Sequence, residues 1–355
     1  MSVRYHVITA DELDASLVEA WRSAQRAVPQ FESPFFCPEF TQLVAAVRDD
    51  VRIVVIEEDG SPVAFFPHQR GLWAQGKAVG GAFSDYHGVV ARSQGDWCVT
   101  DLLRAAKLAV WSFDHLVDPF GKFDAYVTAH ESSPQMDVSA GLHAYLKRIG
   151  GAPAEFARKA RKMEREVGAL TFTLHDRDPT PLEQLLEWKS AQFLKVGAAD
   201  AFARRWTGDL LRNVMAVQTA EFAGVCSVLR AGDRVVAVHA GMRSRTMLHW
   251  WFPKYDEEFA KYSPGIILLM RIAEAITPAG VRTIDLGKGD VRYKRSVMTG
   301  SAELKEGLVE LPSMRARARR LRRAAEAFAA AGGVGAALRL PLRALRRIER
   351  QRTFH

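Results

Sequence analysis

The spacing of hydrophobic and polar positions predicts a chain in which helices and strands are mixed. Apolar residues recur at helical spacing over residues 11–27, 39–47, 102–113, 154–167, 181–196, 201–218 and 264–276. Short apolar runs predict strands over residues 51–58, 63–67, 88–90, 123–127, 224–230, 235–241, 246–252 and 282–286. Asp59–Gly60 and Gly232–Asp233 separate neighbouring runs, as hairpin turns do. The fold class that follows is α/β (or α+β).

The same order of elements occurs twice: helices, then a hairpin-rich sheet, then a helix and a strand. The 355 residues are also too many for one ordinary core. We therefore predict two tandem lobes, each with a mixed central sheet flanked by helices, over residues 1–133 and 134–310. The boundary falls near Ser132–Ser133–Pro134, and a basic helical extension follows over residues 311–355.

The net charge of +8 is concentrated at the C-terminal end. Residues 311–355 hold 12 Arg and 2 Glu, which is +10, so the remaining chain carries −2. A nearly neutral body argues against DNA as a partner. The Arg-rich tail suits peripheral contact with an anionic membrane or binding of a cyclic dinucleotide, and a solvated tail is the plain alternative.

No apolar run is long enough to span a membrane, and the N-terminus shows no secretory pattern, so we expect a cytoplasmic protein, at most peripheral at the inner membrane. Cys37, Cys98 and Cys226 are scattered, without the spacing of a disulfide framework or a zinc site. We expect three reduced thiols and no metal.

Short motifs in both halves resemble the CelD type of GNAT-superfamily acetyltransferase, a type related to the FemAB-like double-GNAT proteins. In the second half they are Lys254–Asp256, Tyr262–Leu269, Ile284–Asp290 and Tyr293–Lys294; in the first half, Ser33–Phe35, Phe65–Pro67 and Gly80–Tyr86. The resemblance implies a two-lobed α/β fold and acetyl-CoA, or another acyl-CoA, as donor. It implies acyl transfer to an amino sugar or polysaccharide intermediate of exopolysaccharide or cell-envelope biosynthesis.

Two other functions stay open within this fold. One is aminoacyl transfer to a peptidoglycan precursor, as in the FemAB branch, which the nearly neutral body weakly opposes. The other is a non-catalytic, degenerate GNAT protein that binds a nucleotide second messenger or the polysaccharide machinery.

The start of the helix over 264–276 is the candidate donor site. Free N–H groups at a helix N-terminus favour the pyrophosphate of CoA. Tyr262 and Ser263 lead into it, with Ser263 as N-cap, and Gly265 allows a ligand to approach. The alternative is an ordinary capped helix. The basic helix over 154–167 is either one wall of an anionic-ligand site or a solvated face paired through Glu164 and Glu166.

The segment from Asp285 to Lys294 is the candidate catalytic loop. Gly287 and Gly289 permit an irregular loop after a strand, where functional side chains commonly lie. By resemblance, Lys294 would neutralise charge on the tetrahedral intermediate or on a substrate phosphate, and Tyr293 would protonate the leaving thiolate. Asp285 or Asp290 would orient the acceptor or take its proton. The alternative is a charged turn in which Asp290 pairs with Lys294.

Further candidates lie on the strands and helices around this loop. His239 is a general base or a core histidine, and Trp251, with Trp250 and His249, lines a pocket or is structural. Three residues one helical turn apart point into the cleft or simply pack: Trp188, Lys189 and Gln192. In the first half, a polar cluster binds the acceptor or forms a hairpin turn: Asp85, Tyr86 and His87.

Overall fold

The computed structural model describes residues 2–289 and 291–312. Asp290 and residues 313–355, and with them nearly all of the predicted basic extension, lie outside the described residues. The strands are β1 (Val3–Ile8), β2 (Val51–Glu58), β3 (Ser61–Arg70), β4 (Gln75–Lys77), β5 (Val90–Ala91), β6 (Val110–Leu116), β7 (Val127–Asp137), β8 (Leu170–Thr173), β9 (Ala223–Ala231), β10 (Arg234–Arg243), β11 (Met247–Tyr255), β12 (Thr283–Asp285) and β13 (Gly300–Glu310). The helices are α1 (Ala15–Ala27), α2 (Pro38–Ala45), α3 (Val99–Ala105), α4 (Leu142–Arg148), α5 (Ala152–Glu166), α6 (Thr180–Lys195), α7 (Arg205–Ala216), α8 (Pro264–Ile276) and α9 (Arg292–Val297).

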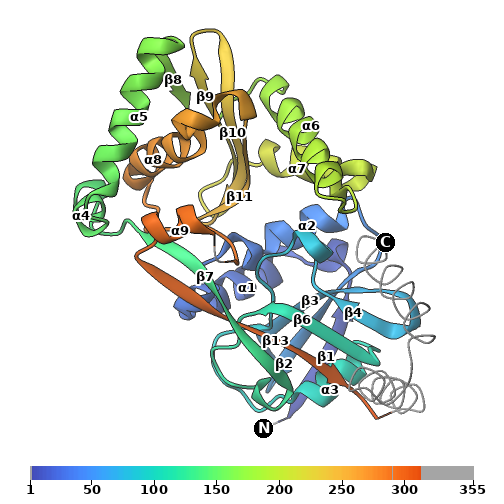
Figure 1. The fold of residues 1–355 in the computed structure, drawn as a ribbon. Coiled ribbons are helices and arrows are strands. Elements are labelled where there is room, and N and C mark those ends of the chain that lie inside the picture. Colours follow the sequence, from blue (N-terminus) through green and yellow to red (C-terminus); the bar gives the residue numbers. More distant parts are fainter. Residues whose placement is uncertain (1, 290, 313–355) are drawn as a thin grey trace, which may run out of the picture.

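All of these strands join one sheet whose order is nearly symmetrical about its centre. The order is β1-β2-β3-β4-β6-β13-β7-β12-β11-β10-β9-β8, with β5 beside β3. Each half contributes antiparallel strands followed by one parallel pair, β4 with β6 and β11 with β12. At the centre, β7 from the first half pairs with β12, and β13 from the second half pairs with β6. Each half therefore gives its last strand to the sheet of the other, as the crossing of β7 and β13 in Figure 1 illustrates.

Helices cover both faces of this sheet. In the upper part of Figure 1, α5 and α8 lie on one side of β8–β11, and α6 and α7 lie on the other. The prediction of an α/β fold with mixed sheets flanked by helices is confirmed. The division into lobes stays a prediction: the boundary at 133 and 134 falls inside β7, and strand pairing continues across it.

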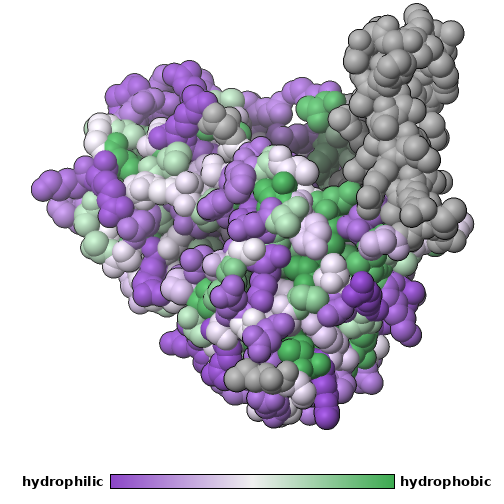
Figure 2. Space-filling model, turned by 90° about the horizontal axis from the view of Figure 1, so that it is seen from below, coloured by the Kyte–Doolittle hydropathy of each residue, from purple (hydrophilic) through white to green (hydrophobic). Residues whose placement is uncertain are grey.

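The hydrophobic cores explain why these elements form. Pro264 begins α8, and the helix then buries one face, including Ile267, Leu268 and Ile272, against the sheet. Each such side chain contributes about 1.5–3 kcal/mol when fully buried. A second core joins helices of both halves, because Trp21 and Phe40 share it with Leu210 and Trp251. Seen from below, the surface is largely hydrophilic, with hydrophobic side chains gathered near the middle (Figure 2).

Two predictions from the first half were wrong. The helix expected over 102–113 ends at Ala105, and Val110–Leu116 is the strand β6. Lys107, with φ of 54°, turns the chain between them. Trp111 and Phe113 on β6 then pack in a third hydrophobic core, formed mostly by residues of the first half of the chain. The strand expected over 123–127 begins only at Val127, because residues 124–126 form a 3-10 turn. No helix of the described chain is long and apolar enough to cross a membrane.

Candidate functional site

The parallel strands β11 and β12 run together for only three residue pairs. Met247, Leu248 and His249 face Thr283, Ile284 and Asp285, and there β12 ends. β11 continues to Tyr255, so within the described chain its edge from Trp250 onward has no strand partner on that side. Backbone N–H and C=O groups at such an edge are available to an extended ligand. His249 and Asp285 lie at the point where the two strands separate.

Asp285 is fully buried and accepts four hydrogen bonds. Its Oδ1 accepts from Ser133 Oγ at 2.7 Å and from the Gly287 amide at 2.8 Å. Its Oδ2 accepts from Tyr86 Oη at 2.5 Å and from Gln135 Nε2 at 3.0 Å. Burial opposes ionisation, but these donors and the neighbouring His249 outweigh it and lower the pKa of Asp285. The site therefore holds a buried carboxylate in its charged form.

His249 connects this carboxylate to a second one from the first half of the chain. Its Nε2 lies 2.8 Å from Asp85 Oδ2, and its Nδ1 lies 3.2 Å from Asp285 Oδ1. Burial by itself would lower the pKa of His249, but the two carboxylates raise it to about 9. His249 and Asp285 are fully buried, whereas 27% of the Asp85 side chain is exposed. We call Asp85, His249 and Asp285 the proton network; Asp85 is its solvent-facing member.

Lys294 closes the loop that follows β12. Its Nζ donates to the carbonyl oxygens of Gly287 at 2.8 Å and Lys288 at 3.0 Å. Gly287 has φ of +75° and Gly289 +107°, conformations that favour glycine, so these residues shape the loop. Burial lowers the pKa of Lys294, and the charges of Asp285 and Asp85 oppose that shift. The structure brings Lys294 to the proton network, with two of its donors used to hold the loop.

The start of α8 lies apart from this loop and is built differently from the prediction. Ser263 precedes Pro264 in a left-handed conformation, with φ of 56°, and its side chain does not cap the helix. Its hydroxyl instead accepts a hydrogen bond from Lys159 of α5 at 3.0 Å. The space above Gly265 is taken by the Tyr255 ring, 3.3 Å from where a Cβ would lie. Ser263 is the N-cap residue by position, as predicted, but its side chain makes no capping hydrogen bond, and Lys159 supplies a cation beside the helix start.

Ion pairs along the basic helix agree in part with its interpretation as a solvated face, and its role as a wall of an anionic-ligand site stays a prediction. Lys159 also pairs with Glu155 at 3.0 Å, and Lys162 lies 3.9 Å from Glu166. Glu166 in turn accepts from the Tyr262 hydroxyl at 2.7 Å. Tyr262 therefore ties α5 to the segment before α8, and its ring belongs to the hydrophobic core.

His239 lies on the α8 face of the sheet, outside the proton network. Its ring is fully buried and stacks on Trp250 with centroids 4.3 Å apart. Burial lowers the pKa of His239 to about 3, so the side chain is neutral and a poor base near pH 7. Tyr293 packs on the same core, where burial raises its pKa. The role of Tyr293 as an acid stays a prediction.

The remaining candidates are divided between the core and the surface. Trp251 is buried and donates to the Phe83 carbonyl at 2.9 Å. Trp188 is half-buried and packs against the same hydrophobic core, whereas Gln192 is exposed. Lys189 lies over the Phe252 ring at 5.8 Å, and burial lowers its pKa to about 8. His87 is buried beside Asp114, 4.0 Å away, and takes no part in the proton network.

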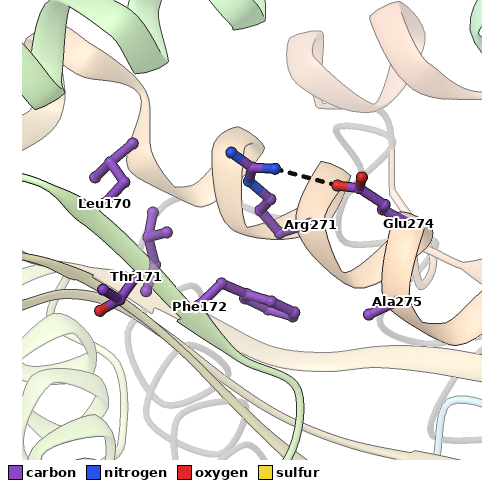
Figure 3. Close-up of a pocket in the computed structure, with 7 residues that line it drawn as sticks. Leu170, Thr171, Phe172, Arg271, Glu274 and Ala275 are labelled. Atoms are coloured by element: carbon purple, nitrogen blue, oxygen red, sulfur yellow. Dashed lines mark hydrogen bonds and ion pairs between the residues drawn. The ribbon is translucent and has the colours of Figure 1, made fainter.

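Two cavities matter for the choice of site. One, of about 680 Å³, has Tyr86 and Gln135 in its wall, the two side chains that donate to Asp285 Oδ2. The other, of about 320 Å³, lies between β8 and α8 (Figure 3), where the Arg271–Glu274 ion pair is its only charged lining. None of the residues of the second cavity belongs to the proton network. Within residues 2–289 and 291–312, no group of three or more His, Cys, Asp or Glu side chains could hold a metal ion.

Comparison with known proteins identifies the class of domain that carries this geometry. Residues 153–295 match the family model of the acetyltransferase (GNAT) domain. That range contains β11, β12, α8 and the Asp285–Lys294 loop. The expectation of a GNAT-type acyltransferase enzyme is confirmed at the level of this segment, which is 143 of the 355 residues. A comparison with the curated proteins finds no match.

Solved structures show that the fold extends over both halves. The chain is similar to FemX, with a TM-score of 0.55 and 9% identity over 87% of this chain and 96% of that one. It is also similar to the C-terminal DUF2156 domain of a protein named as a lysylphosphatidylglycerol synthetase from Agrobacterium fabrum. There the TM-score is 0.52 and the identity 15%, over 85% of this chain and 95% of that one. At such low identity these similarities establish the fold alone.

Two residues of the proton network, Asp85 and Asp285, are predicted from the sequence as functional, but the central His249 is not. Asp85, Tyr86, Asp285 and Lys294 were expected to be functional, and the structure brings them together. His249 was considered only as a pocket-lining residue. Two further hydrogen-bond donors to Asp285 are not among the predicted site residues: Ser133, which lies at the predicted domain boundary, and Gln135. Their polar alternation along β7 was the available signal.

Proposed function

We propose that this protein transfers an acyl group from acyl-CoA to an amine, with the reaction taking place beside the proton network. The observation that carries the proposal is the separation of β11 from β12 at His249 and Asp285, within the GNAT domain. An extended pantetheine chain would pair with the free edge of β11. The pyrophosphate would lie at the start of α8, beside Lys159.

In the proposed reaction the acceptor nitrogen attacks the thioester carbonyl carbon, and the C–S bond then breaks. An ammonium acceptor loses one proton before attack and a second as the tetrahedral intermediate collapses. One of these protons goes to the leaving thiolate, so the products are an amide, CoA thiol and one released proton. Asp85 is the group proposed to accept a proton from the amine, since it is the exposed member of the network.

The other residues of the site have supporting roles. His249 and Asp285 fix the position of the Asp85 carboxylate through the imidazole. Lys294 supplies positive charge near the developing oxyanion, and Tyr293 is the proposed acid for the thiolate. An amino sugar or polysaccharide intermediate remains our proposed acceptor, in exopolysaccharide or cell-envelope biosynthesis.

Aminoacyl transfer is the second candidate, because FemX and a protein named as a lysylphosphatidylglycerol synthetase share the fold. The two candidates differ in donor, so a thiol-release assay separates them. The full-length protein is incubated with acetyl-CoA and a panel of amines, including glucosamine, and free CoA is measured. Amine-dependent release supports acyl-CoA chemistry. Calorimetry that detects no acetyl-CoA binding, together with no release, would contradict it.

A further inference from the structure

The two most exposed large apolar side chains of the described residues are neighbours in the turn between β3 and β4. Leu72 is 83% exposed and Trp73 is 72% exposed. All eight tryptophans lie in the described ranges, and the seven others are buried or half-buried. Single apolar side chains at a surface are ordinary, whereas a Leu and a Trp side by side at the end of a turn form an apolar projection. We call Leu72 and Trp73 the apolar tip.

The backbone presents the apolar tip in a conformation that L-residues rarely adopt. Trp73 has φ of 62° and ψ of 28°, and the next residue, Ala74, has φ of 57°. Two consecutive left-handed residues without glycine are disfavoured by steric contacts of Cβ, and such backbone is a reason to look for a function. Neither side chain of the apolar tip belongs to one of the three hydrophobic cores. The apolar character of this turn therefore does not serve the packing of the fold.

Sheet pairing places the apolar tip beside the point where the Arg-rich tail begins. The Ala74 carbonyl accepts a hydrogen bond from the Ala109 amide at 2.8 Å, and the Ala109 carbonyl accepts one from the Leu311 amide at 3.0 Å. The strands that adjoin these residues, β4, β6 and β13, are neighbours in the sheet (Figure 1). Neighbouring strands lie about 4.8 Å apart, so the backbone of Leu311 lies on the order of 10 Å from that of Ala74.

Two exposed cations of the described chain lie at the same end of the sheet. Arg70 ends β3, and Lys107 turns the chain before β6; neither forms an ion pair with another described residue. The carboxylates on the neighbouring segments are Asp49, Asp50 and Glu310. Asp50 is paired with an arginine of its own loop at 2.8 Å. Charge from the body alone is therefore nearly balanced here, and the tail decides the sign.

The tail brings a dense positive charge to this end of the sheet. Six Arg occur among residues 315–323, and residues 311–355 carry +10 in total. A chain extends by at most about 3.6 Å per residue, so Arg315 lies within about 11 Å of Pro312 whatever path the chain takes. Strong positive charge and an exposed apolar projection therefore occur together.

We propose that this end of the sheet is a membrane-binding surface, with the apolar tip inserted among the headgroups of an anionic lipid bilayer and the Arg-rich tail on the lipid phosphates. Trp side chains favour the interface of a membrane, and basic segments are attracted to anionic lipid. One such signal alone gives marginal, reversible binding, whereas two together hold a protein at the membrane. A second copy of the chain fits less well, because two strongly positive ends repel each other. The inference is independent of the proposed acyl transfer.

Binding of the full-length protein to lipid vesicles tests the surface as a whole. Vesicles of phosphatidylcholine, alone or with about 30% phosphatidylglycerol, are sedimented, and the bound protein is measured. We expect affinity at least about tenfold higher for the anionic vesicles, and a decrease as salt is raised, because salt screens the attraction. Doxyl-labelled lipid should quench the fluorescence of Trp73, since the other tryptophans are not exposed.

The double variant Leu72→Ser with Trp73→Ser tests the apolar tip. Its affinity for anionic vesicles should fall at least about tenfold, because only the electrostatic signal remains. The matched control is Leu194→Ser with Val196→Ser, at the end of α6 in the other half of the chain, where the side chains are 67% and 71% exposed. The control should bind anionic vesicles within about twofold of wild type.

A tail variant tests the second signal. Replacing four arginines by Gln, at Arg315, Arg317, Arg319 and Arg320, should also lower affinity for anionic vesicles at least about tenfold. Urea unfolding of the apolar-tip variant should match wild type, since its two side chains are exposed. Equal vesicle binding by the apolar-tip variant and wild type, or no preference for anionic vesicles, would overturn the inference. Sedimentation that shows a dimer lost in the apolar-tip variant, with no vesicle binding, would overturn it in favour of a second copy.

Discussion

Replacing Asp85 by Asn separates catalysis from stability more cleanly than any other change in the site. The Asn side chain has the same shape, and its oxygen can still accept the hydrogen bond from His249 Nε2, which Asp85 accepts at 2.8 Å. What it loses is the ability to take up a proton. General-base catalysis contributes about 100- to 10,000-fold to rate, so we expect kcat to fall by at least about 100-fold.

The stability of the Asp85→Asn variant should change much less. The variant loses the charge from one hydrogen bond, at a side chain that is 27% exposed. We therefore expect the free energy of unfolding to fall by about 1–2 kcal/mol. Initial rates with acetyl-CoA and an active amine, together with urea unfolding, give both quantities. The KM for acetyl-CoA should stay within about twofold, because the proposed contacts of the pantetheine and the pyrophosphate lie along β11 and at the start of α8 and do not involve the Asp85 charge.

Glu57→Gln serves as the control for this variant. Glu57 also pairs with a histidine, His6 at 3.0 Å, but between β1 and β2 and outside the proposed site. Its removal should leave kcat unchanged. Full activity in Asp85→Asn, measured beside this control, would refute Asp85 as the proton acceptor.

Three further predictions follow from the same geometry. Asp285→Asn should lower the free energy of unfolding in urea by about 3–5 kcal/mol, because it leaves His249 and buried donors without their carboxylate. A decrease below about 1 kcal/mol would count against the proton network. The pKa of His249 is raised from 6.5 to about 9, so its stabilisation is complete below pH 6.5 and is lost as the pH rises toward 9. The stability difference between wild type and His249→Gln should therefore shrink over that window by an amount on the order of 3 kcal/mol, and a constant difference would contradict the shift. Lys159→Ala should raise the KM for acetyl-CoA about tenfold with little effect on kcat, because it removes a cation beside the start of α8; Lys162→Ala on the same helix is its control.

Much of the fold was readable from local pattern. The helix α8 begins and ends where Pro264 and the apolar spacing predict, and β2 occupies the predicted residues 51–58. The helix α8 buries one apolar face, and β2 is a short apolar run that is buried on both faces, so local pattern defines both elements. The central strand β12 lies within the predicted strand 282–286, but most of β7 and all of β13 are not predicted. The exposed positions of β7 are largely polar, and its partners are β12 and β13. Pairing partners so distant in sequence leave no local signal.

In the candidate site, too, contacts within one short segment could be predicted from the sequence, whereas contacts between distant segments could not. Gly287 and Lys294 lie in one short segment, and their closeness follows from the loop itself. Asp85 and His249 are 164 residues apart, and they meet only because the two halves exchange their last strands and share a core. No spacing rule predicts such a pair. For His239 the strand position was read correctly, but its neutrality depends on burial that the sequence does not reveal.

A crystal structure of the full chain with acetyl-CoA tests the central claim most directly. The account requires the pantetheine along the free edge of β11, the pyrophosphate beside Ser263 and Lys159, and the thioester carbonyl next to Asp85 and Lys294. Acetyl-CoA bound at another surface, such as the cavity between β8 and α8, would contradict the proposed site.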